Sequence, residues 1–150
     1  MSGTTRRTFL AGSALFSVVP LAPARATPEA MAQAIRALVG DRSLREGRVT
    51  LDLPPLVENG NAVPLTVSVD SPMTEADHVR AIHVFNEKNP QPRVFDAVLG
   101  PRNGRAVIAT RIKLGDSQRI VAIAETSRGE LYSASADVIV TLAACLEDLT

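Results

Sequence analysis

The chain is poor in the residues from which several kinds of functional site are built. Among its 150 residues there are one cysteine, one tyrosine, four phenylalanines and no tryptophan. A lone cysteine has no disulfide partner within its own chain. So few aromatic rings offer little surface on which bases or sugars can stack. The composition therefore argues against a disulfide framework and against a stacking platform for nucleic acid.

An excess of positive charge is also missing. The 16 basic side chains are balanced by 16 acidic ones, and no block of like charges occurs along the chain. Binding to nucleic acid depends on clustered lysine and arginine that neutralise phosphates. We therefore expect no nucleic acid partner.

The N-terminus carries a short apolar run, much shorter than a membrane span. Arg6 and Arg7 precede it, residues 11–21 contain no charge, and Ala24-Arg25-Ala26 follows. Such a run is too short to cross a bilayer, and the whole pattern is typical of a cleaved export signal of the twin-arginine form. We expect residues 1–26 to be a twin-arginine signal peptide. The protein would then be periplasmic, with no stable membrane insertion.

Residues 27–150 are enough for one domain with a single core. They begin with Thr27, Pro28 and Glu29, a capping residue, a proline suited to the first helical position and an acid near the positive end of the helix dipole. Apolar residues then follow at helical spacing, namely Met31, Ile35, Leu38 and Val39. The pattern predicts one short N-terminal helix that Gly40 ends.

After residue 48 the apolar residues alternate with polar ones, which is typical of half-buried strands. Leu51 and Leu53 form one such run and Leu65, Val67 and Val69 another, with a turn at 58–61 between them. Further strands are expected at 79–85, 93–99, 105–113, 119–125 and 131–142. About seven strands with one helix predict an all-β, immunoglobulin-like antiparallel β-sandwich.

Three connections carry specific expectations. Asn103-Gly104 and Arg128-Gly129 suit tight hairpins, because glycine accepts positive φ. Residues 71–78 contain Thr74 and Asp77 at the spacing of an approximate capping box, which allows a short helical turn, although a crossover between sheets is favoured. Residues 40–47 resemble a linker.

The two histidines are weak candidates for a metal site. His78 and His83 are five residues apart, and an odd separation on a strand places side chains on opposite faces. No second thiol is available to complete a ligand set. We expect no metal, and each histidine to be hydrogen-bonded or to face solvent.

Cys145 has two interpretations of comparable weight on the residues alone. It shares a strand face with Ile139, Thr141 and Ala143, where it would be a small core residue. It also lies near a chain terminus, where residues are usually mobile and exposed and a thiol is free to react. A bridge between two chains is a third outcome. A thiol enzyme is disfavoured, because no local signature marks a nucleophile activated by histidine.

Several ordered segments carry a resemblance to a known family. They are residues 51–54, 58–64, 67–74, 77–79, 85–90, 111–112 and 138–141, followed by the late cysteine. From the leader to Cys145, the chain resembles the SoxY family of thiosulfate-oxidation carrier proteins. The resemblance implies an immunoglobulin-like sandwich over residues 27–150 with a C-terminal carrier arm over about 141–150.

The resemblance also implies a function. Cys145 matches the thiol that carries covalent sulfur intermediates, so the chain would be a carrier without cofactor and without enzymatic activity of its own. A SoxZ-like subunit would form a heterodimer with it. SoxAX, SoxB and a sulfane dehydrogenase would act in turn on the cargo.

The end of the chain departs from the family pattern. The family arm is Gly-Gly-Cys-Gly-Gly, whereas here Ala143 and Ala144 precede the thiol and Leu146-Glu147-Asp148-Leu149-Thr150 follows it. Alanine lacks the conformational freedom of glycine, so a stiffer arm is expected. Two alternatives follow, a SoxY-like binding or assembly module without thiosulfate carriage and a carrier of a different sulfur cargo.

Overall fold

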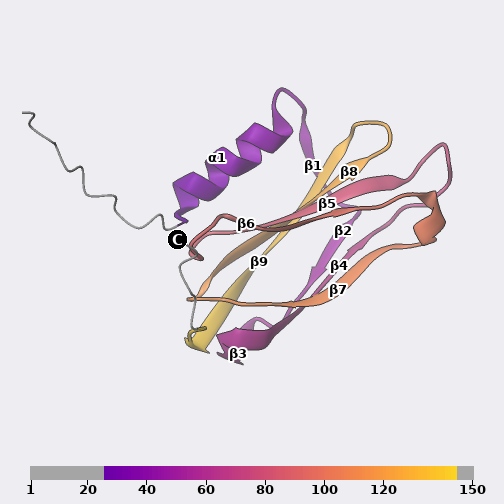
Figure 1. The fold of residues 1–150 in the computed structure, drawn as a ribbon. Helices are drawn as coiled ribbons and strands as arrows, with labels where there is room; N and C mark the ends of the chain where they lie inside the picture. The colour runs from indigo at the N-terminus through magenta and orange to yellow at the C-terminus, as the bar shows by residue number, and fades with distance from the viewer. Residues whose placement is uncertain (1–25, 145–150) are drawn as a thin grey trace, which may run out of the picture.

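A computed structural model describes residues 26–144, which form one helix packed on a two-layer β-sandwich (Figure 1). The elements are α1 (Pro28–Val39), β1 (Leu44–Glu46), β2 (Val49–Asp52), β3 (Leu56–Asn59), β4 (Val63–Val69), β5 (Val79–Asn86), β6 (Arg93–Val98), β7 (Ala106–Ile112), β8 (Gln118–Thr126) and β9 (Leu131–Leu142), with 3₁₀ turns η1 (Gly60–Ala62) and η2 (Pro101–Asn103). Within 26–144, no helix is both long enough and apolar enough to span a membrane.

The larger sheet has the strand order β1-β9-β8-β5-β6, and β3 also pairs with β9. The smaller sheet has the order β2-β4-β7. All pairings are antiparallel except those of β1 and β3 with β9, which are parallel. The immunoglobulin-like antiparallel sandwich predicted from the sequence is confirmed, with two short parallel additions at one strand.

The core lies between the two sheets and follows from the alternation in the sequence. Every second residue of β4 is buried, from Val63 through Leu65 and Val67 to Val69. Facing them from the larger sheet are buried residues of β5 and β8, including Ile82, Val84, Ile120 and Ala122. Because side chains of a strand alternate between faces, this one pattern fixes both the register and the inner face of each sheet.

Helix α1 covers part of the outer face of the larger sheet (Figure 1). The Thr27 hydroxyl accepts a hydrogen bond from the Ala30 N–H at 3.2 Å, and Gly40 with φ 58° ends the helix, as predicted. Met31 packs in a second apolar cluster with Phe85, Ile123 and Leu131. The second cluster holds the helix on β5, β8 and β9.

Two strands were missed by the sequence analysis. β1 lies in the segment that resembled a linker, and β3 overlaps the turn expected at 58–61. β1 has three residues and all of them are exposed, so no alternation marks it. Both strands exist because they pair with β9, a long-range contact that local periodicity does not report.

The turn predictions had mixed outcomes. Gly129 has φ 80° in the β8–β9 hairpin, which confirms the prediction there. The hairpin predicted at Asn103-Gly104 is wrong, because β6 and β7 belong to different sheets. Gly104, with φ 70°, instead follows the 3₁₀ turn η2. Its positive φ serves the end of that turn.

Residues 71–78 form the favoured crossover, from β4 in the smaller sheet to β5 in the larger one. The Thr74 hydroxyl accepts the Asp77 N–H at 3.1 Å, and the Thr74 N–H donates to the Asp77 carbonyl at 2.9 Å. This reciprocal pair closes a bend, and no helical turn forms.

The core assignment predicts unequal effects for two leucines. Leu65 is 1% exposed between the sheets, so Leu65→Ala should lower the free energy of unfolding by about 2–5 kcal/mol, measured by urea denaturation. Leu56→Ala is the matched control, because Leu56 is 57% exposed on β3. Equal losses in the two variants would contradict the position of the core.

Candidate functional site

The described residues stop one position before the predicted carrier thiol. Cys145 itself lies outside the described residues, but its Cα must lie about 3.8 Å from that of Ala144, the last described residue. The surroundings of Ala144 are therefore the described part of the candidate site. The sequence analysis weighed a metal site at the two histidines and a working thiol at Cys145. Ala144, next to that cysteine in the sequence, lies just after the end of β9.

The first residues of the expected arm, 141–144, are part of the sandwich. Thr141 and Leu142 belong to β9, and Leu142 pairs with Asn59 of β3. The Thr141 hydroxyl donates to the Glu58 carbonyl at 3.1 Å. The expected start of the arm at about residue 141 is thus too early, because parallel pairing with β3 extends β9 beyond its partner β8.

Ala144 is held by a chain of backbone hydrogen bonds. Its N–H donates to the Leu114 carbonyl at 3.0 Å, and the Leu114 N–H donates to the Gly60 carbonyl at 2.8 Å. We call Gly60, Leu114 and Ala144 the arm root. All three are buried, although residues 141–143 before Ala144 are exposed.

Asn89 fixes the loop that contributes Leu114. Its side-chain amide donates to the Lys113 carbonyl at 2.8 Å, and its side-chain oxygen accepts the Gly115 N–H at 3.0 Å. The same oxygen accepts from the side chain of Gln118, which is 5% exposed. Asn89 thereby satisfies backbone groups on both sides of Leu114, which positions the acceptor for Ala144.

Two further contacts tie this loop to its neighbours. The Ser117 hydroxyl accepts the Val140 N–H at 2.9 Å, which links the loop to β9. Lys88 Nζ lies 3.0 Å from the Asp116 carboxylate. The hydrogen bond from Lys88, with a second from the Ser117 N–H, holds the pKa of Asp116 below its ordinary value.

The histidines occupy other parts of the fold and are hydrogen-bonded, as expected. His78 Nδ1 lies 3.0 Å from the Thr74 carbonyl, and His83 Nδ1 lies 2.5 Å from Asp96, which also accepts from Arg93. Over residues 26–144, no group of three or more histidine, cysteine, aspartate or glutamate side chains is placed to hold a metal ion.

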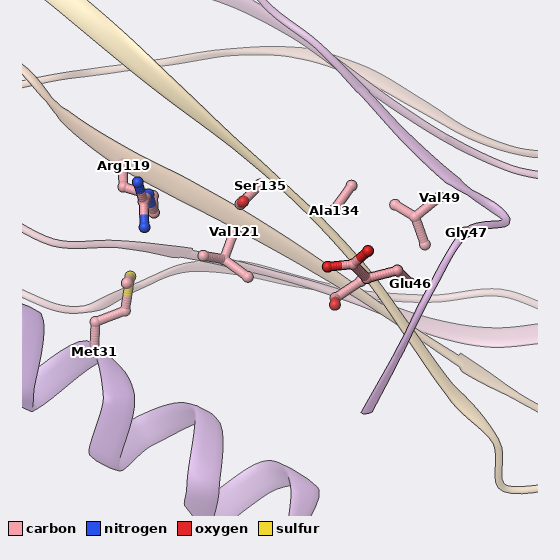
Figure 2. A pocket seen from close by; sticks show the side chains of 9 residues that line it. Met31, Glu46, Gly47, Val49, Arg119, Val121, Ala134 and Ser135 are labelled. Carbon is pink, nitrogen blue, oxygen red and sulfur yellow. The ribbon is translucent and has the colours of Figure 1, made fainter. Parts of the chain in front are cut away.

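A shallow groove of about 540 Å³ lies on the outer face of the larger sheet. Figure 2 shows it between Met31 of α1, Glu46 of β1 and the side chains of β8 and β9, among them Arg119 and Ser135. Arg119 is bound to Asp137 at 2.9 Å, and that hydrogen bond raises the pKa of Arg119 and lowers the pKa of Asp137. From Ser135 to Leu142 the chain runs about 23 Å along β9, so the groove is remote from the arm root.

The sequence analysis located part of this site. Gly60 and Asn89 lie in segments 58–64 and 85–90, which carry the family resemblance, but their contacts with residues 113–115 and 144 were not predicted. Leu114 was missed altogether. Leu114 comes directly after the strand expected at 105–113. It accepts the Ala144 N–H through its backbone carbonyl, and the type of side chain does not reveal such a bond.

Asn89→Ala should destabilise the protein by about 1–3 kcal/mol, because it removes three hydrogen bonds, two of which are partly buried. Hydrogen exchange should accelerate at the Gly115 amide. Asn103→Ala is the control, since the Asn103 side chain accepts one exposed bond, from Gly100. A smaller effect at position 89 than at 103 would contradict the role given to Asn89.

Lys88→Ala should raise the pKa of Asp116 towards its ordinary value, measured by NMR titration of the carboxyl group. Because the folded pKa is lowered, the Lys88–Asp116 pair stabilises the protein above the unfolded pKa of aspartate. Its contribution is lost as the pH falls through the lowered folded value. Lys113→Ala, the other lysine variant, should leave the titration of Asp116 nearly unchanged.

Comparison with solved structures supports the fold. The sulfur carrier protein SoxY from Chlorobium limicola f thiosulfatophilum superposes with a TM-score of 0.63 at 26% identity, covering 76% of this chain and 98% of that one. A superoxide reductase (neelaredoxin) from Ignicoccus hospitalis superposes with a TM-score of 0.56 at 19% identity, covering 63% and 80%. At that identity, the likeness to the reductase concerns the fold alone.

Comparison with protein families is more specific. A search among curated proteins found no match. The family model described as sulfur oxidation protein SoxY matches residues 35–145, a span that covers all nine strands and ends at Cys145. This protein therefore belongs to the SoxY family of sulfur oxidation proteins.

Proposed function

We propose that this protein is a periplasmic carrier of sulfur intermediates, loaded covalently on the thiol of Cys145 during thiosulfate oxidation. The observation that carries the proposal is that the family match runs to residue 145, the position of the only cysteine in the chain. The described sandwich ends one residue earlier, at a buried and hydrogen-bonded Ala144.

The loading step joins the Cys145 thiolate to thiosulfate. A bond forms between the cysteine sulfur and the terminal sulfur of thiosulfate, and two electrons pass to a haem enzyme of the SoxAX type. Hydrolysis by a SoxB-type enzyme then breaks the bond between sulfur and the sulfonate group. Water supplies the oxygen of the released sulfate, and a persulfide stays on Cys145.

The sandwich contributes position and no chemistry to these steps. The polar residues near the arm root bind backbone groups: Asn89 holds the loop on both sides of Leu114, and Ser117 holds β9. None of them is arranged as a nucleophile with an adjacent base. The carrier therefore depends on enzymes of the same compartment, and the leader at residues 1–26 would deliver it there by twin-arginine export.

A SoxZ-like subunit completes the proposed carrier as a heterodimer. The chain is not an enzyme in this proposal, and it requires no cofactor other than the sulfur that it carries.

Loading is tested by mass spectrometry of the intact chain. The protein with a SoxZ-like subunit, SoxAX and thiosulfate should gain the mass of one thiosulfate group, and Cys145→Ser should gain nothing. The parallel control is a variant in which residues 143–147 are replaced by Gly-Gly-Cys-Gly-Gly.

Three outcomes would overturn parts of the proposal. A Cys145 thiol that stays unmodified while the glycine variant is loaded would rule out thiosulfate as cargo and favour a binding module or another cargo. Conversion of thiosulfate by the purified chain alone would show an enzyme. A dimer that disappears on reduction in electrophoresis would show that the thiol serves as a bridge.

A further inference from the structure

The pairing of β9 is interrupted on one of its two edges. One edge pairs with β8 from Leu131 to Val138. The opposite edge pairs with β1 as far as Ser133 and with β3 from Ile139 onward. Between these two short strands, no strand of residues 26–144 pairs with this edge. We call residues 134–138 on this side the open edge. The interval that it spans is about 20 Å long in an extended strand.

The open edge presents two unpaired peptide units. The Ile139 N–H donates to the Pro55 carbonyl, which lies away from β8. Every second residue of a strand directs its peptide groups to the same side, so Ser135 and Asp137 also direct their N–H and C=O groups away from β8. None of these four groups has a partner in the pairings of β1 and β3, or in the turns and loops of the described chain. Both residues are exposed, so the edge is accessible.

Residues at both ends of the gap keep the open edge unpaired. After β1, Gly47 with φ 92° and Arg48 with φ 58° turn the chain into β2, which pairs with β4 in the smaller sheet. Before β3, Pro54 and Pro55 have no N–H to donate to β9. The chain therefore leaves the larger sheet between β1 and β3, and its own course produces the gap.

The groove of about 540 Å³ lies beside this edge. Its lining includes Glu46 and Gly47 at the end of β1 and residues 133–135 of β9. Figure 2 shows Gly47 and Val49 on one side of β9 and Arg119 on the other. The side chains of residues 133–135 are two serines and an alanine, which are small and leave the backbone approachable. An unpaired and accessible strand edge is a template for a further strand.

The groove carries a negative charge that no described residue neutralises. The Glu46 side chain forms no hydrogen bond or ion pair within residues 26–144. Its neighbour Arg45 is paired with Glu130 at 2.7 Å. Arg119, the cation in the lining, is paired with Asp137 at 2.9 Å. A carboxylate that faces a groove without a partner favours an occupant with a cationic side chain.

We propose that the open edge is a docking site for an extended segment of another protein that carries a lysine or an arginine. The segment adds a strand to the larger sheet between β1 and β3, and its backbone pairs with Ser135 and Asp137. About four or five extended residues fit the interval. A basic residue opposite Ser135 then lies over the groove beside Glu46. Docking involves no thiol, so this site is additional to the proposed carrier function.

The test uses a fluorescein-labelled peptide, Thr-Lys-Val-Lys-Thr, capped at both ends. Its two lysines lie on one face of an extended strand. Fluorescence anisotropy should show saturable binding to the full chain. Glu46→Gln should weaken this binding roughly twofold to fivefold. Glu75→Gln is the matched control, because Glu75 is an exposed acid in the crossover at 71–78 and should leave binding unchanged.

Main-chain pairing is tested by N-methylation of the peptide. Two versions are methylated at alternate residues, one on the lysines and one on the other three. Only one set of N–H groups can face β9, so one version should lose binding and the other should keep it. Equal binding of both versions and the parent peptide would contradict strand addition.

Two proline variants test which backbone groups are used. Ser135→Pro removes an N–H that has no partner in the fold, so the unfolding transition should persist while the peptide no longer binds. Ala136→Pro is the control for direction, because the Ala136 N–H faces β8 and its loss should lower the urea midpoint.

Three outcomes would overturn the docking site. They are a peptide that fails to bind the unaltered chain at millimolar concentration, a folded Ser135→Pro variant that binds it normally, and self-association of the chain that Ser135→Pro abolishes. The last outcome would identify a second copy of this chain as the occupant.

Discussion

The structure depends on the pairing of β9 with three other strands. Over its first eight residues β9 pairs antiparallel with β8, and it pairs parallel with β1 near its start and with β3 near its end. β8 alone would support β9 only as far as Val138. Pairing with the parallel strand β3 extends β9 to Leu142. The path of the chain towards the arm root therefore depends on a short strand that has one buried residue, Val57.

Polar contacts are distributed unequally between the two ends of β9. At the late end, Asn89, Ser117 and Gln118 bind backbone groups, and of these side chains Gln118 is buried while the other two are half-buried. At the early end, the groove beside α1 contains exposed polar side chains and one ion pair, Arg119 with Asp137. Side-chain hydrogen bonds to the backbone are thus concentrated at the end of β9 that leads to Ala144, and the groove lies at the other end.

The sequence was sufficient for what local patterns determine. The alternation in β4, the capping by Thr27 and the turn at Gly129 were all predicted, because each depends on a few neighbouring residues. β1 and β3 were missed because their existence comes from pairing with β9. The arm root was missed for a similar reason: it joins three segments through backbone atoms, and only the absence of a side chain at position 60 records it in the sequence.

The two ends of the described chain meet through one residue. The Ala26 N–H donates to the Asn89 carbonyl at 2.9 Å, and the Asn89 side chain holds the loop that binds Ala144. The two attachments differ in kind, because Ala26 binds a backbone carbonyl that any residue would supply, whereas the loop that binds Ala144 depends on the Asn89 side chain. A substitution at position 89 would therefore separate the first described residue from the last without removing the contact of either with the backbone.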